Sequence, residues 1–153
     1  MGTQVPLNFM YMKKLSVFLV LLVIALSCKK NKDKNSCPTD MTSLAGVYKV
    51  TAYTYQTSAS APPQDYYNQV FPDSCERDDL ITLNQNGNYI YTDAGMVCSP
   101  AGDAQGTWSV SGTTITIDLT PSTIASFDCK NLVLTNSNVI TTGDKENITF
   151  TRQ

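Results

Sequence analysis

The stretch "DLITLNQNGNYIYTD", residues 79–93, contains two short runs of β-branched and aromatic residues on either side of a turn. Residues 79–84 and 88–93 form the runs, and Asn86-Gly87 lies between them. An Asn-Gly pair readily adopts the positive φ angles that a two-residue hairpin turn requires. The stretch therefore predicts an antiparallel β-hairpin.

The rest of the chain after residue 44 repeats this pattern of short β-type segments and turn residues. Six further strands are predicted, at residues 46–57, 105–110, 113–119, 122–128, 131–136 and 146–152. No segment with helical periodicity exceeds a turn or two. Eight short strands in consecutive hairpins predict an all-β fold, an up-and-down antiparallel β-barrel. A β-sandwich is the alternative, because hydrophobic periodicity alone does not separate the two.

Alternation along the predicted strands gives a candidate barrel interior, since every second side chain of a strand points to the same face. These inward positions are Tyr48, Val50, Ile81, Leu83, Trp108, Val110, Ile115, Ile117, Leu132, Leu134, Ile148 and Phe150. Residues 56–78 form one long connection with three prolines and no clear strand, and such loops are usually functional or disordered. Its Tyr66, Tyr67 and Phe71 are candidates for a lid over the barrel mouth or for a plug within the core.

The first residues indicate an export signal. Lys13-Lys14 precedes twelve uncharged residues, 15–26, which span only about 18 Å as a helix against a hydrocarbon core of about 30 Å. A basic start and a short apolar run are typical of a secretory signal peptide, here residues 1–27 with Met12 as the expected true start.

The sequence "ALSC", residues 25–28, resembles the lipobox of bacterial lipoproteins, in which the cysteine is acylated. This resemblance implies a lipid on Cys28 and a membrane as partner. Residues 28–43 are lysine-rich and lack periodicity, so they predict a flexible tether before a domain at residues 44–153. By similarity to lipoprotein sorting signals, Lys29 favours the outer membrane of the cell envelope. A soluble secreted protein with a free thiol is the alternative.

Four cysteines remain once Cys28 carries the lipid: Cys37, Cys75, Cys98 and Cys129. Three pairings are possible in an oxidising compartment. Cys75 and Cys98 flank the predicted hairpin, which favours a disulfide between them. Cys37–Cys129 is then the remaining pair, unless Cys37 in the tether is free.

Charge and composition exclude several classes of function. From residue 37 onward, five basic residues face twelve acidic ones, a net charge of −7 that disfavours nucleic acid. Histidine is absent, so catalytic triads of the Ser-His-Asp kind are impossible within this chain. The acidic residues Asp73, Glu76, Asp78 and Asp79 do not have the spacing of an EF-hand. No metal, no cofactor and no catalysis are predicted.

From residue 44 to 152 the chain resembles the lipocalin-like domain of small bacterial lipoproteins. The resemblance rests on "LAGVYKVTAYTY", "DSCERDDLITLNQNGNY", Cys98 before "GTWSVSGTTITI", and "ITFTRQ". It implies a barrel able to hold a small apolar ligand. It also implies that Arg152 packs over an aromatic ring at the barrel base, where Tyr48 stands in the place of the lipocalin tryptophan.

These observations favour a non-enzymatic, membrane-tethered binding module that takes up a small hydrophobic ligand in the cell envelope. The alternative is a structural or interaction lipoprotein, with a barrel filled by its own side chains and surface loops that contact an envelope protein.

Overall fold

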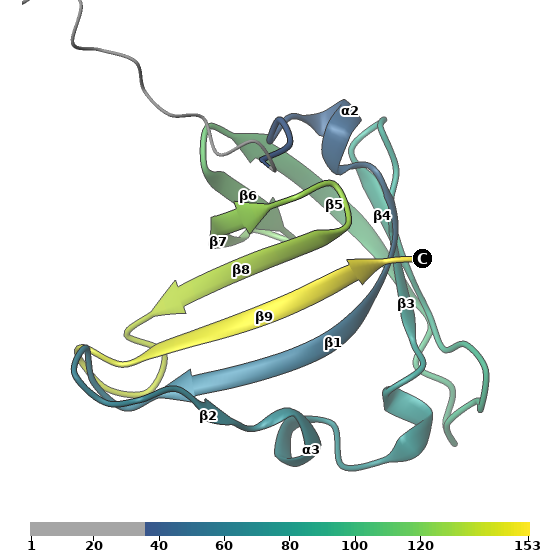
Figure 1. Ribbon diagram of the computed structural model, residues 1–153. Coiled ribbons are helices and arrows are strands. Elements are labelled where there is room, and N and C mark those ends of the chain that lie inside the picture. The colour runs from purple at the N-terminus through teal and green to yellow at the C-terminus, as the bar shows by residue number, and fades with distance from the viewer. Residues whose placement is uncertain (1–35) are drawn as a thin grey trace, which may run out of the picture. The chain divides into compact units, whose positions relative to one another are not determined.

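The computed structural model describes residues 36–153, which form a ring of antiparallel strands (Figure 1). The strands are β1 (Gly46–Gln56), β2 (Gln64–Asp65), β3 (Leu80–Leu83), β4 (Asn88–Thr92), β5 (Ala104–Ser111), β6 (Thr114–Ile117), β7 (Thr120–Phe127), β8 (Asn131–Ser137) and β9 (Lys145–Arg152). Three short helices accompany them: α2 (Met41–Leu44), α3 (Tyr67–Val70) and the 3₁₀ helix η1 (Ser74–Glu76). Among the residues described, no helix has the length and hydrophobicity needed to span a bilayer.

The order of strand pairing confirms the predicted up-and-down barrel. Each strand from β3 to β9 pairs with its chain neighbour, and β1 pairs with both β3 and β9, which closes the ring. The two-residue β2 was not predicted and lies outside the ring, on the edge of β1. Closure removes the free sheet edges that a sandwich would retain.

The predicted turn at Asn86-Gly87 joins β3 to β4, with Gly87 at a φ of +87°. The turn between β6 and β7 differs from the prediction. The sequence predicts a strand that includes Leu119, but β6 ends at Ile117, and Asp118 and Leu119 adopt φ angles of 46° and 70°. Leu119 is therefore 91% exposed.

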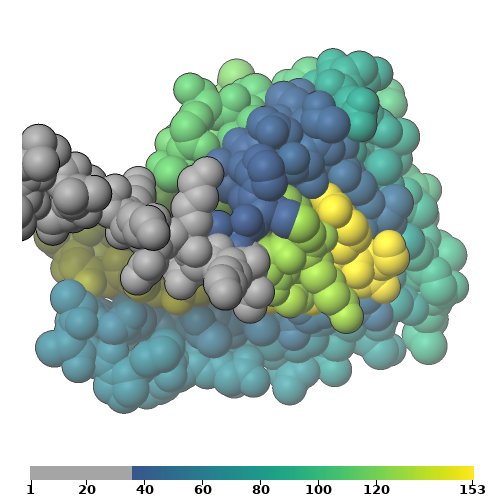
Figure 2. All heavy atoms as spheres, turned by 45° about the horizontal axis from the view of Figure 1, so that its top comes forward, coloured from purple at the N-terminus to yellow at the C-terminus, as the bar shows by residue number. Residues whose placement is uncertain are grey.

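The barrel has a closed end, where the chain enters. The segment from Cys37 to α2 lies over this end, beside the end of β9 (Figure 2). Cys37 forms a disulfide with Cys129, with 5.3 Å between the Cα atoms, and its amide donates to the carbonyl of Phe127. Asp40 caps α2 by accepting a hydrogen bond from the amide of Ser43. The prediction of a flexible tether up to residue 43 is therefore wrong for residues 37–43, which are fixed to the barrel.

The core occupies the half of the barrel next to the closed end. Its buried members are Leu44, Tyr48, Leu83, Tyr89, Trp108, Ile115, Ile124, Phe127, Leu132 and Leu134, and the predicted Ile81, Val110, Ile117 and Phe150 pack against them. The predicted interior residues Val50 and Ile148 are only half-buried and lie outside this cluster.

A β-bulge in β1 changes which side chains line the interior toward the open end. The register of β1 on β9 shifts between Val50 and Ala52. Beyond this shift, Tyr53 pairs with Ile148 and Tyr55 with Glu146, on the same face of β9 as the core residue Phe150. An extra residue in one strand reverses its alternation, so these two tyrosines point inward.

Candidate functional site

The apolar centre of the barrel is filled by side chains. The void that remains there measures about 10 Å³ and is lined by Tyr48, Ile81, Leu83, Ile115, Ile117, Leu132, Leu134 and Phe150. A volume of this size holds about one water molecule. The centre therefore has no room for the small hydrophobic ligand that the sequence predicts.

A larger hollow, of about 540 Å³, lies toward the open end, where β7 and β8 part. It is lined by Thr114, Thr120, Pro121, Ser122, Thr123, Thr135, Asn136, Ser137, Val139 and Glu146. Its volume falls within the range of about 300–1,000 Å³ that is usual for small-molecule sites. We refer to these ten residues as the β7–β8 hollow.

The register of the two strands explains the hollow. Pairing of β7 with β8 begins only at Thr123 and Thr135. Before that point, residues 120–122 of β7 pair with β6, and residues 136–137 of β8 pair with β9. The two strand edges that face the hollow consequently offer backbone groups outside the ladder, which are available to a ligand.

Glu146 is the charged member of the hollow. Its side chain is 8% exposed, its Oε1 accepts from the amide of Asn136 at 2.7 Å, and its Oε2 accepts from the hydroxyl of Tyr53. Burial, and then the bond to this carboxylate, raise the pKa of Tyr53 above its ordinary value. The phenol therefore stays protonated and remains a donor to Glu146.

Asp144 holds the β8–β9 loop on one side of the hollow. It is 1% exposed and accepts from the amides of Val139, Ile140 and Thr141 at 2.7–2.8 Å. Tyr55 donates to it at 2.6 Å. Burial raises its pKa, but the bonds from Tyr55 and the three amides outweigh this effect and lower the pKa to about 2. The loop is thus organised around an ionised carboxylate.

The predicted lid residues lie along the edge of β1 rather than in the β7–β8 hollow. Tyr67 in α3 donates to the carbonyl of Val50 at 3.0 Å, and its ring packs against that of Phe71 in a tilted arrangement with 5.3 Å between the ring centres. The Tyr66 ring meets the edge of Tyr55 at 5.8 Å. Because β1 pairs with β3 only over residues 46–48, these aromatic side chains pack where the two strands diverge.

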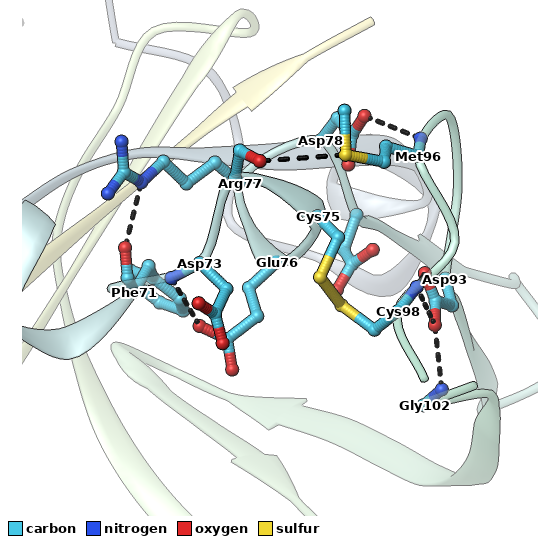
Figure 3. The surroundings of a disulfide bond; sticks show 12 residues. Phe71, Asp73, Cys75, Glu76, Arg77, Asp78, Asp93, Met96, Cys98 and Gly102 are labelled. Atoms are coloured by element: carbon cyan, nitrogen blue, oxygen red, sulfur yellow. Dashed lines mark hydrogen bonds between the residues drawn. A yellow bond between two sulfur atoms is a disulfide. The ribbon is translucent and has the colours of Figure 1, made fainter. Parts of the chain in front are cut away.

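The predicted disulfide between Cys75 and Cys98 is present, with 5.3 Å between the Cα atoms (Figure 3). It joins η1 to the β4–β5 loop, in which the buried Asp93 accepts from the amides of Cys98 and Gly102. The acidic residues near it serve local structure: Asp73 and Glu76 form a capping box on η1.

The other two members of the predicted acidic cluster accept hydrogen bonds from the β4–β5 side. Asp78 accepts from the amide of Met96, and Asp79 accepts from the Tyr91 hydroxyl and the Ala94 amide. Within residues 36–153, no group of three or more acidic or cysteine side chains has an arrangement that suits a metal ion.

Sequence reasoning missed the residues of the β7–β8 hollow. Glu146 sits in a predicted strand and Asn136 at the end of another, so neither belongs to a motif. Glu146 and Asn136 come together through the pairing of β8 with β9 and the bulge in β1. No short stretch of the sequence predicts either feature. The predicted lipid attachment at Cys28 lies outside the described residues.

A family model described as a lipocalin-like domain matches residues 44–152. Comparison with curated proteins and with solved structures gave no match.

Proposed function

The chain belongs to the lipocalin-like domain family, and from this premise we propose that it is a non-enzymatic binding domain tethered to a membrane. We place its ligand in the β7–β8 hollow. The observation that carries this proposal is the contrast between the two spaces: about 10 Å³ in the apolar centre and about 540 Å³ in the hollow. A ligand occupies existing space more readily than it displaces packed side chains, because emptying a core costs free energy.

The site suits binding rather than catalysis. Its polar groups are hydroxyls, amides and a single carboxylate. A nucleophile needs a neighbouring base within hydrogen-bond reach. The neighbours of Glu146 are the amide of Asn136 and the hydroxyl of Tyr53, whose pKa is raised so that it stays protonated, and neither is an activated nucleophile.

The position of the hollow fits a tethered domain. The chain enters at the closed end through Cys37, whereas the hollow lies near the other end of β8. Seven residues of β8 separate the two ends, about 23 Å of extended strand. A lipid on Cys28 would thus connect to the domain at the end away from the hollow.

Nuclear magnetic resonance with two probes tests the binding site. Glucose presents hydroxyl groups, and the dye anilinonaphthalene sulfonate presents apolar rings. We expect glucose to shift the amide signals of residues 120–123 and 135–137. We expect the dye to leave the signals of Leu132 and Leu134 unchanged. Absence of any perturbation at the hollow by either probe, or entry of the dye into the core, would contradict the proposed site.

The tether has its own test. Cys28→Ser removes the acylated side chain, so the variant should move from the membrane fraction to the soluble fraction, since stable anchoring depends on the lipid chains. Cys75→Ser with Cys98→Ser serves as the control for loss of cysteine, and this variant should stay with the membrane. Retention of Cys28→Ser in the membrane fraction would refute lipid attachment at that residue.

A second function, docking of an envelope protein, is favoured by the distribution of exposed apolar side chains. Five of them lie in loops at the open end: Met96, Val97, Leu119, Val139 and Ile140. Replacement of Leu119 and Ile140 by serine would abolish such docking, while glucose binding in the hollow would persist.

A further inference from the structure

We propose that the β7–β8 hollow selects a small hydroxylated molecule that carries a positive charge, and that Glu146 supplies the countercharge. This inference rests on the proposed function and adds the chemical class of the ligand. It replaces the hydrophobic ligand expected from the family resemblance.

The lining accounts for the hydroxyl groups of the ligand. Four of the lining hydroxyl residues project to the face opposite Glu146: Thr114, Thr123, Thr135 and Ser137. Thr120 and Ser122 pair with Ile117 and Ile115 and so project to the interior face, which Glu146 and Asn136 share, and their two hydroxyls are those that a ligand beside Glu146 meets. Each hydroxyl donates one hydrogen bond and accepts others, and Asn136 adds an amide. A polyol has the same dual character, so it can satisfy such a surface. An apolar ligand would leave these groups without partners, which costs about 1–3 kcal/mol for each buried group.

The position of Glu146 accounts for the positive charge. The carboxylate is buried, and both partners described above, a phenol and an amide, are neutral. A carboxylate offers about four lone-pair sites, so two hydrogen bonds leave room for another donor. Buried charges are normally paired, because an unpaired one loses its hydration without compensation.

The basic side chains of β9 do not form an ion pair with Glu146. Lys145 is adjacent to Glu146 in the strand and so projects from the opposite face, where its register partners are Gln56 and Ser137. Arg152 lies six residues further on, about 20 Å away along the strand. It binds Tyr48 at the closed end.

The net negative charge of the domain also favours a positively charged ligand. Five basic residues face twelve acidic ones from residue 37 onward, so the field of the domain attracts cations. The apolar Leu119 and Val139 flank the hollow from two sides, next to Thr120 and within the lining, respectively. The site therefore combines a polar floor, one buried anion and a partly apolar rim.

Three related sugars separate charge from hydroxyl recognition. Glucosamine is protonated at slightly acidic pH, whereas glucose and N-acetylglucosamine are neutral and also rich in hydroxyl groups. Titrations of the ¹⁵N-labelled protein should show glucosamine binding at the amides of residues 120–123 and 135–137. We expect its affinity to exceed that of either neutral sugar by about tenfold, as one charge-assisted hydrogen bond supplies.

Glu146→Gln keeps the size of the side chain and removes its charge. In this variant glucosamine should bind no better than glucose. Asp103→Asn removes one exposed charge at the same end of the barrel and should leave the preference for glucosamine intact. The dispersion of amide signals verifies that each variant is folded.

The outcomes distinguish this inference from the proposed function. Equal binding of the three sugars by the native protein, or an unchanged preference in folded Glu146→Gln, would overturn the inference and leave the hollow as a binding site. If no sugar perturbs the amides of the hollow, the inference fails, and the proposed site fails with it when the dye leaves those amides unchanged as well. If Glu146→Gln does not fold, the relative affinities of the native protein for the three sugars still test the inference.

Discussion

The guanidinium carbon of Arg152 lies 5.2 Å from the centre of the Tyr48 ring, and the same guanidinium donates to the Tyr48 hydroxyl at 2.7 Å. It also donates to the carbonyls of Ser43 and Ala45. Arg152 in β9 thus links β1 to the segment that covers the closed end. A Cβ at Gly46 would lie 2.9 Å from the Arg152 Nε, so a larger residue there would force this side chain to shift.

Loss of this contact should destabilise the barrel. Arg152→Met removes a cation–π contact and several hydrogen bonds to a charged donor, and should lower the free energy of unfolding by about 2–4 kcal/mol. Urea denaturation measures the effect. Arg77→Met is the control, since Arg77 donates only to the carbonyls of Phe71 and Pro72 within its own loop. Equal effects of the two variants would contradict a special role for Arg152.

The two disulfides should contribute unequally. Cys37–Cys129 spans 92 residues and Cys75–Cys98 spans 23. On the chain-entropy account, the longer loop restricts the unfolded chain more, by about 1 kcal/mol. Paired serine variants of each bridge, compared by thermal and urea unfolding, should therefore rank Cys37–Cys129 as the more stabilising. The opposite order would mean that contacts in the folded state outweigh the loop entropy.

Asp144 should make stability depend on acid. Its pKa is lowered from 3.8 to about 2 in the folded protein, so between these values the unfolded chain binds more protons. The contribution of this group is complete above pH 4 and is lost as the pH falls toward 2. In Asp144→Asn, the melting temperature should be lower at neutral pH and should decline less between pH 4 and pH 2. Parallel melting curves for the native protein and the variant across that range would contradict this role.

Much of the barrel follows from local pattern. The turn at Asn86-Gly87, the alternation of Leu132 and Leu134, and the pairing of Cys75 with Cys98 are all visible in the sequence, because each depends on residues near in the chain or on simple alternation. The contact of Arg152 with Tyr48 followed from family resemblance. Closure of the ring by β1 and β9 depends on register across most of the chain.

The binding hollow was beyond such reasoning. The bulge near Thr51 has no composition signal, and it places Tyr53 beside Glu146. The turn at Asp118 and Leu119 uses positive φ angles without glycine or asparagine, so its sequence resembles a strand. Asp118 is held there by its bond from Tyr89, a residue 29 positions away.

Filling the hollow tests the central claim most directly. Ser122 pairs with the fully buried Ile115 and lines the hollow, so Ser122→Trp should occupy the space in which the ligand would lie. Ser109→Trp places the same side chain on the exposed outer face of β5. In ¹⁵N titrations with glucosamine, the native protein and Ser109→Trp should show saturable shifts at residues 120–123 and 135–137, and folded Ser122→Trp should show none. Unchanged binding by Ser122→Trp would contradict the account.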